Sequence, residues 1–384
     1  MLAGPVPNDL PSDAGGWRAR AHAFARRAVA PIAEQVDRDD RLPETIVSEL
    51  AGEGFLGLGI PEKWGGAGGD ARSTVAVLEE LSRACSAVGV LVAVHLSVCA
   101  SPILSSGTDA QRDRYLPALV RGEKVGAFAL TEPNAGSDTA RLETRYAKES
   151  DGFRLRGSKT FISNAASAGV VLVFATSDPA LGHRGISAFI VPPGTSGFSV
   201  VRRFEKLGLR GSETAELHLD DVHLPADSML GGEGEGLRIA LGALQGGRVG
   251  IAACALGVAQ AAFDEMRRSV AADDAEWKRT LLARAFADLS AARALVAQAA
   301  EAKDRGVSYV TFASVAKLVA SRAAVQIASC GVDVAGATGT QSGSLAERLL
   351  RDARVFPIVE GTTEIQELIL ARSLLSETDG RNPL

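Results

Sequence analysis

One acidic residue, Glu360, is a candidate catalytic base. It ends an apolar run that contains Val355, Phe356 and Ile358, and Gly361 follows it directly. Apolar surroundings disfavour the charged form of a carboxylate and therefore raise its pKa. A carboxylate with a raised pKa suits the removal of a weakly acidic proton near neutral pH. The alternative interpretation is an ordinary surface turn between two helices.

The residues after Glu360 are consistent with a site at this turn. Gly361 allows the backbone to turn sharply or to approach a ligand closely, so it is a candidate substrate contact. Thr362 and Thr363 supply two hydroxyls, and an amphipathic run begins at Ile365. The pattern predicts that a loop presents Glu360 between two helices.

Four other segments combine glycine, hydroxyl and charged residues next to predicted strands or helices: Thr131–Asp138, Lys159–Asn164, Lys206–Thr214 and Gln245–Ala252. In the first, the amides around Gly136 and Ser137 are able to hold a phosphate, although the same residues also form ordinary turns. In the second, Phe161 and Ser163 share one strand face because Ile162 separates them. The alternative there is a simple half-buried strand.

Arg248 is the charged residue of the fourth segment, which is predicted to open a long helix. A positive charge at a helix start is unfavourable against the helix dipole. The position therefore favours an anionic partner for Arg248, with a solvated surface arginine as the alternative.

The elements that must position these residues fall into three parts. The length of 384 residues suggests two or three domains. Residues 1–124 have helical patterns, 125–230 have short alternating strands with glycine and proline turns, and 231–384 are rich in alanine and leucine at helical spacing. The prediction is an α+β protein with an N-terminal helical domain, a middle β-barrel or sandwich and a C-terminal helical bundle.

Composition excludes several classes of function. The net charge of −5 and the absence of a basic block argue against nucleic-acid and anionic-membrane partners. The four cysteines are far apart, which predicts buried thiols and no metal site. The glycine-rich stretch 61–69 has no Lys-Ser/Thr pair after it, so it is predicted to be a loop between helices. No signal peptide and no apolar run of membrane-spanning length is found, which predicts a soluble cytoplasmic protein.

Together, the motifs resemble those of the acyl-CoA dehydrogenase family, and the resemblance covers about residues 17–375. The most specific matches are Gly126-Ala-Phe-Ala-Leu-Thr-Glu-Pro-Asn-Ala-Gly-Ser-Asp138 and Val359-Glu-Gly-Thr-Thr-Glu-Ile-Gln366. Val94-His95 with Ser97, and the segment Gly247–Ala253, are similar to the short-chain, butyryl-type members.

The resemblance implies a role for each matching residue. It implies an FAD cofactor whose ring contacts Phe128, Leu130 and Thr131, and whose face and N5 are covered by Phe161 and Ser163. Ser137 would contact the pyrophosphate region and the pantetheine of the substrate, and Arg248 would lie on the substrate side. Thr362 and Glu364 would contact the dinucleotide. Glu360 matches the family's base, and Gly247 occupies the position from which some relatives take theirs.

The resemblance also implies an activity and partners. The expected reaction is α,β-dehydrogenation of a short-chain acyl-CoA, or of another acyl thioester, to the trans-2-enoyl thioester. Electrons would pass to an electron-transferring flavoprotein, and the protein would be a homotetramer or homodimer.

Two cofactor segments depart from the family pattern. The usual Arg-x-x-Phe-Gly is absent from Met266–Trp277, where Arg267 or Arg268 is a candidate substitute. The second segment is Asp333–Gly339, in which Asp333 replaces a glutamine while Gly336 is kept. These changes leave other hypotheses open: a dehydrogenase of carrier-protein-bound acyl groups, a thioester-binding relative that oxidises nothing, or a flavin oxidase or monooxygenase on the same fold.

Overall fold

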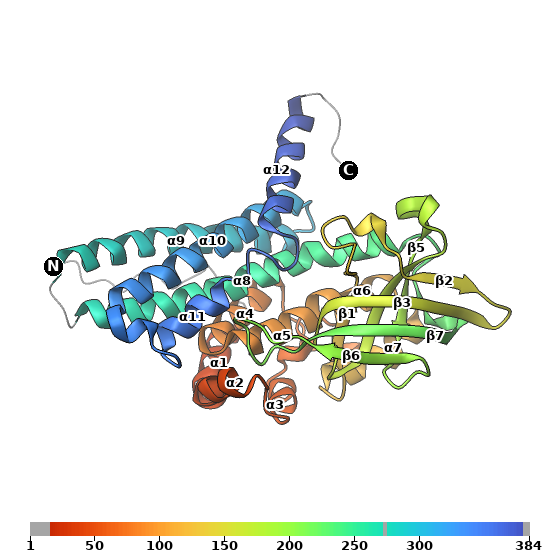
Figure 1. Ribbon diagram of the computed structural model, residues 1–384, viewed down its shortest axis with the longest axis horizontal. Helices are drawn as coiled ribbons and strands as arrows, with labels where there is room; N and C mark the ends of the chain where they lie inside the picture. Colours follow the sequence, from red (N-terminus) through yellow and green to blue (C-terminus); the bar gives the residue numbers. More distant parts are fainter. Residues whose placement is uncertain (1–15, 272–274, 379–384) are drawn as a thin grey trace.

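The computed structural model describes residues 16–271 and 275–378 of the chain. Residues 1–15, for which the sequence predicts a frayed end, lie outside this part. The described chain forms a helical N-terminal part, a sheet in the middle and a helical C-terminal part, as Figure 1 shows. The predicted fold class is therefore confirmed.

The N-terminal part consists of helices separated by short turns: α1 Trp17–Phe24, α2 Ala33–Asp39, α3 Ile46–Gly52, α4 Ala71–Ala84, α5 Ser86–Val94, α6 Ser101–Ser106 and α7 Asp109–Val120. The sequence pattern predicts continuous helices over about residues 17–36 and 88–105, but π-helical turns interrupt them at Ala25–Val29 and at His95–Ala100. Each turn lies just before a proline, Pro31 or Pro102. Proline has no N–H to donate to the preceding turn, which explains the local change of the helical hydrogen bonds.

The middle part contains the strands β1 Val125–Ala129, β2 Arg145–Lys148, β3 Gly152–Ser163, β4 Ala168–Thr176, β5 Ile186–Val191, β6 Phe198–Arg203, β7 Thr214–Pro225 and β8 Met229–Leu230. Within the described residues they form one eight-stranded sheet in the order β6-β7-β3-β2-β4-β5-β8, with β1 parallel to β4. Alternate residues of β4 enter different cores: Leu172 and Phe174 face one apolar cluster, and Val171 and Val173 face another. Apolar residues cover both faces, which explains the continuous apolar runs in β4 and β5.

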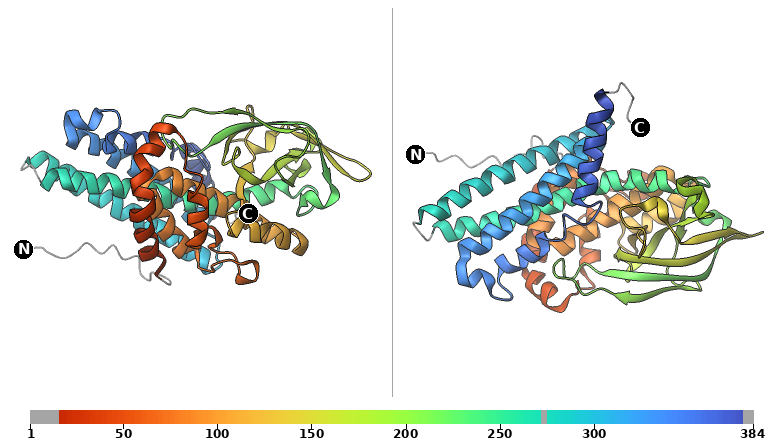
Figure 2. Two further views of the ribbon diagram at one scale, coloured as in Figure 1. Left: turned by 90° about the horizontal axis from the view of Figure 1, so that it is seen from below. Right: turned by 45° about the horizontal axis from the view of Figure 1, so that its top comes forward.

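The C-terminal part begins with three long helices, α8 Gly236–Ala271, α9 Glu276–Asp304 and α10 Val310–Ala335, followed by α11 Leu345–Ala353 and α12 Thr363–Thr378. Helices α8, α9, α10 and α11 pack together, and α4 of the N-terminal part packs on α8. Helix α12 projects away from the rest of the protein, and its foot lies where the helical bundle meets the sheet (Figures 1 and 2). Glu360 lies in the turn that directly precedes α12.

Three helical stretches are long and apolar enough to cross a membrane by length and composition alone, namely Ser86–Ser106, Gly236–Ala271 and Val310–Thr340. The prediction that no apolar run has this length was wrong, because alanine, glycine and valine make these stretches apolar on several sides. Their most apolar windows are 89%, 78% and 50% buried inside the protein. Packing against other elements of the chain thus covers much of this apolar surface.

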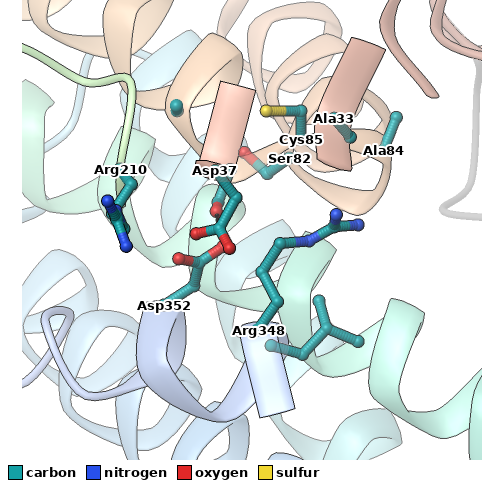
Figure 3. A pocket seen from close by; sticks show the side chains of 11 residues that line it. Ala33, Asp37, Ser82, Ala84, Cys85, Arg210, Arg348 and Asp352 are labelled. Carbon is teal, nitrogen blue, oxygen red and sulfur yellow. Dashed lines mark hydrogen bonds between the residues drawn. The ribbon is translucent and has the colours of Figure 1, made fainter. Parts of the chain in front are cut away.

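The segment that leads to Glu360 is fixed by Asp352, a buried carboxyl at the end of α11. Asp352 accepts a hydrogen bond from the Ser86 hydroxyl at the start of α5 and another, of 2.6 Å, from the Leu209 N–H. One side chain thus joins all three parts of the chain. A cavity of about 10 Å³, room for about one water molecule, lies beside it (Figure 3).

We expect Asp352→Ala to lower the free energy of unfolding by about 2–3 kcal/mol, because the Leu209 N–H and the Ser86 hydroxyl would lose their buried acceptor. Urea denaturation followed by circular dichroism measures this difference. Asp220→Ala, which changes an exposed carboxylate on β7, is the control and should stay within about 0.5 kcal/mol of the parent. Equal stabilities of the two variants would contradict the anchoring role of Asp352.

Candidate active site

The turn that carries Glu360 has an unusual backbone. Glu360 and Gly361 have φ angles of +55° and +95°, so two consecutive residues are left-handed. A left-handed non-glycine residue costs roughly 1–3 kcal/mol and persists only where its surroundings hold it. The Gly361 carbonyl accepts hydrogen bonds from Lys317 Nζ at 2.7 Å and from Gln366 Nε2 at 2.9 Å. Two side chains therefore hold the strained turn in place.

The Glu360 carboxylate is directed at α8. Its Oε2 atom is buried and has no hydrogen-bond partner among the described residues. A Cβ atom added to Gly247 would lie 2.5 Å from this oxygen, so the glycine leaves the space that the carboxylate occupies. Burial raises the pKa of Glu360 to about 7, although the nearby Arg248 and Lys317 oppose the rise. A carboxylate with this pKa and a free oxygen is suited to accept a proton at neutral pH.

Arg248 lies in the interior of α8, thirteen residues into a helix that begins at Gly236. The prediction that it opens a helix was wrong, and with it the argument from the helix dipole. The helix continues through Gly246 and Gly247, and the missing side chain of Gly247 leaves room for the Glu360 carboxylate. Arg248 is nonetheless buried, and its Nε has no hydrogen-bond partner within the described part of the chain. Burial lowers the pKa of its guanidinium, while the charge of Glu360 opposes this.

A buried ion pair fixes the loop that follows β1. Lys159 Nζ lies 2.6 Å from Glu132 Oε1 and donates to the Leu130 carbonyl at 3.2 Å. The Glu132 carboxylate also accepts from the N–H groups of Glu143, at 2.6 Å, and Thr144, at 3.0 Å. Burial lowers the pKa of Lys159 to about 8. Burial alone would raise the pKa of Glu132, but Lys159 and the hydrogen bonds keep it below its ordinary value.

Phe161 stands out on the strand β3. Its side chain is 63% exposed, its φ is +56°, and its ring centroid lies 4.7 Å from that of Phe204. The pairing of β3 with β7 shifts register between Lys159 and Ile162. Ile162 is buried and Ser163 is half-buried, so Phe161 and Ser163 lie on the less buried side as predicted. An exposed aromatic ring on a strained backbone is a candidate stacking surface.

The structure places the candidate flavin contacts of β1 next to β3. Thr160, the neighbour of Phe161, donates its N–H to the Thr131 carbonyl at 2.9 Å. Leu130 is buried and Phe128 is half-buried, with its ring 4.8 Å from that of Phe174. Ser137 is exposed in the following loop. The end of β1 and the bulged part of β3 therefore form one surface.

The residues proposed for the dinucleotide do not come together within one chain. Thr362 and Glu364 lie at the foot of α12 beside Lys317, which is in the first third of α10. Asp333 lies sixteen residues further along α10, about 24 Å away at 1.5 Å per residue. Gly336 follows it, and both are exposed. Arg267 and Arg268 are exposed near the end of α8, and residues 272–274 of that segment lie outside the described part.

The residues present fit a bound flavin at the junction of β1 and β3. The exposed Phe161 ring offers a stacking face, and the loop at Gly136 is open, since a Cβ added there would meet no atom within 4 Å. The buried Glu132–Lys159 pair fixes the start of this loop. The fit does not extend to Asp333 and Gly336, which are too distant in the same chain.

A helical part, a β part and a helical bundle, together with an exposed aromatic surface that fits a flavin, are the features of an FAD-dependent oxidoreductase of CH–CH groups. Comparison with protein families agrees. The chain matches the N-terminal, middle and C-terminal domains of acyl-CoA dehydrogenase over residues 13–123, 127–222 and 234–375. The chain belongs to the acyl-CoA dehydrogenase family, whose members are flavoproteins that use FAD.

Individual relatives resemble the chain over nearly its whole length. An acyl-CoA dehydrogenase of Bacillus subtilis is 43% identical over 92% of this chain and 96% of its own. A short-chain specific acyl-CoA dehydrogenase of Clostridium acetobutylicum is 40% identical with the same coverage. The structure of butyryl-CoA dehydrogenase from Megasphaera elsdenii superposes with a TM-score of 0.92 at 37% identity, covering 94% of this chain and 97% of its own.

Sequence reasoning gave no role to four buried polar side chains: Lys317, Lys159, its partner Glu132, and Asn164. Asn164 is left-handed, at φ +62°, and donates to the carbonyls of Gly126 and Leu91 at 3.1 and 3.3 Å. The available signal was a charged residue within an otherwise apolar helix or strand, as at Lys317 and Lys159, since lysine is almost never fully buried without a partner.

Proposed function

We propose that this protein dehydrogenates a short-chain acyl thioester between its α and β carbons, with Glu360 as the base. The observation that supports this most strongly is the Glu360 Oε2 atom, which is buried, has no partner in the described chain and faces the space beside Gly247. The carboxylate has a pKa of about 7 and is thus available as a base at neutral pH.

The chain's own groups would divide the work as follows. Glu360 removes the α-proton, and its backbone N–H donates to the thioester carbonyl, where negative charge develops. Gly361 lets the substrate approach the backbone closely, and Arg248 lies on the substrate side of the carboxylate. When bound, FAD supplies the acceptor for the β-hydride. Burial of the Glu360 Oε2 atom limits the access of water to the carboxylate.

For the cofactor, Phe128, Leu130 and Thr131 of the β1 end would contact the flavin ring, with Phe161 and Ser163 covering its face. Ser137 would serve both the pyrophosphate region and the substrate, and Thr362 and Glu364 would contact the dinucleotide. The proximity of β1 and β3 through the Thr160–Thr131 hydrogen bond supports one shared flavin surface.

We further propose a homo-oligomer, a dimer or a tetramer, in the cytoplasm. Asp333 and Gly336 lie too far from Thr362 for one chain to use all three on one FAD, so they would serve the cofactor of a second copy. The projecting helix α12 exposes Leu368, Leu374 and Leu375, which supports a contact there. An electron-transferring flavoprotein would accept the electrons.

The direct test is the absorption spectrum of the purified protein before and after anaerobic addition of butyryl-CoA. Bleaching of the flavin bands establishes the proposed half-reaction. If the bands stay unchanged with butyryl-CoA but bleach with butyryl attached to a carrier protein, the acyl group of the substrate is carried by a protein and not by CoA. Protein that takes up no flavin on incubation with FAD would contradict the proposal altogether.

The pH dependence of flavin reduction follows from the pKa of Glu360. The base must be ionised, so the rate at saturating substrate should rise with pH and level off above about pH 7. Below this pKa it should fall roughly tenfold per pH unit, as the ionised fraction does. Anaerobic stopped-flow measurements between pH 5.5 and 9 check this, and a limb near pH 4.5 would show that Glu360 is not buried during catalysis.

A further inference from the structure

Lys317 is a charged side chain that the proposed chemistry does not use. It lies within α10, and its side chain has 0% exposed surface. Its Nζ atom donates to the Gly361 carbonyl at 2.7 Å. Lysine is rarely buried to this degree without a specific partner, because burial of the ammonium is costly. The burial of Lys317 against the Glu360 turn therefore indicates a specific role for its ammonium group.

The Gly361 carbonyl has a second hydrogen-bond donor, which is uncharged. This donor allows the effect of the Lys317 charge to be separated from the effect of its hydrogen bond. Gln366 Nε2 donates to the same oxygen at 2.9 Å, and Gln366 is also fully buried. A Cβ on Gly361 would lie 2.5 Å from this Nε2 atom, so the amide is packed against the turn. Both side chains hold the left-handed pair Glu360–Gly361, but only Lys317 adds a positive charge.

The charged and titratable groups around this turn come from three helices. Arg248 and Cys254 reach it from α8, Lys317 from α10 and Glu364 from the start of α12, while Tyr309 lies near Arg248 just before α10. Burial lowers the pKa of Lys317 to about 8, Glu360 and Glu364 oppose this, and Arg248 adds to it. Two buried cations thus act on the Glu360 carboxylate, whose Oε2 atom is buried.

We propose that Lys317 is a positioning residue for the base: its ammonium group fixes the Gly361 carbonyl, and with it the Glu360 turn, and stabilises the Glu360 carboxylate. Lys317 acts from α10, through its hydrogen bond to the backbone and through its charge. It does not contact the substrate. The catalytic part of the inference rests on the proposed function, whereas the effect on Glu360 itself does not.

The first test measures the proton affinity of Glu360 without any turnover. A glutamate whose folded pKa is above its unfolded value destabilises the protein as pH rises between the two values. The difference in free energy of unfolding between the parent and Glu360→Gln should therefore grow from about pH 4.5 and level off near pH 7. In a Lys317→Met background we expect this difference in the free energy of unfolding to level off at least one pH unit higher. Each additional pH unit adds about 1.4 kcal/mol to the difference.

Three substitutions separate charge from hydrogen bonding in flavin reduction. Lys317→Met should shift the pH at which the rate of flavin reduction falls off upward by one pH unit or more. At pH 6.5 the rate should therefore be about tenfold lower, in addition to any decrease seen at high pH. Lys317→Arg, which keeps the charge, should restore the pH dependence of the parent. Gln366→Met removes a hydrogen-bond donor to the same carbonyl. It should lower the maximal rate of flavin reduction at high pH, while the apparent pKa of the rate stays near 7.

The outcomes distinguish the two proposals. If no acyl thioester reduces the flavin of the parent protein, the proposed function fails, and the unfolding experiment still decides the role of Lys317. If Lys317→Met changes neither the pH dependence of flavin reduction nor that of the stability difference between the protein with Glu360 and the Glu360→Gln variant, Lys317 only fills space and the inference is wrong. Should Lys317→Met not fold, Lys317→Gln, which keeps a donor but no charge, answers the same question.

Discussion

Glu360→Gln is expected to reduce the rate of flavin reduction by butyryl-CoA by roughly 10⁴-fold, the upper end of the range for loss of a general base. The amide keeps the shape of the carboxylate but cannot accept the α-proton. Helix α8 offers no substitute carboxylate at the position that faces Glu360, because that position is Gly247. Rapid mixing under anaerobic conditions, followed at the flavin absorption band, measures this loss.

The matched control is Glu367→Gln, which neutralises an exposed carboxylate on the same helix α12, where Glu367 pairs with Arg322. It should reduce flavin at the parent rate. Bound FAD should be equal in both variants, so that a change in rate reports the base and not the cofactor. Reduction by Glu360→Gln within tenfold of the parent would remove Glu360 from its assigned role.

The same substitution should stabilise the fold. A buried carboxylate with a raised pKa must lose its proton in an unfavourable place, so its contribution to stability falls as pH rises towards 7. At pH 8, Glu360→Gln should therefore be more stable than the parent by up to about 3 kcal/mol. The gain should vanish below about pH 4.5, where the carboxyl is protonated in both folded and unfolded chains.

Lys159→Met should give the largest loss of stability, about 3–5 kcal/mol, because it leaves the buried Glu132 carboxylate without its partner. The loop after β1 would lose its attachment to β3 through the Leu130 carbonyl as well. Since this loop carries Ser137 and follows Thr131, we also expect weaker FAD retention. Urea denaturation and equilibrium dialysis of the flavin measure the two effects.

The double variant Glu132→Gln/Lys159→Met should recover at least about 1 kcal/mol, since it removes the unpaired charge together with its partner. Lys148→Met, at an exposed position on β2, controls for loss of a lysine from the same sheet. If the double variant is less stable than the sum of the two single changes predicts, the pair is not the main source of the loss.

The sequence by itself determined the three-part architecture and the candidate base. Short runs such as Val170–Ala175 indicate strands, and long alanine-rich runs indicate helices, because these patterns depend on local periodicity alone. Glu360 was a candidate because the motif Val359–Gln366 resembles that of the family, whereas its apolar neighbours alone left an ordinary surface turn as an alternative. The motifs around Thr131 and Phe161 were identifiable because each lies within one strand and its loop.

Only the tertiary structure decided how charge is distributed around the base. Lys317 is 43 residues from Glu360 in the chain, and Arg248 is more than a hundred. No local pattern shows that both face one carboxylate. The left-handed backbone of Glu360 depends on donors from α10 and α12, and the separation of Asp333 from Thr362 depends on the direction of α10. Burial of charge and backbone strain are set by packing between distant segments, whereas helix and strand periods are set by neighbours in sequence.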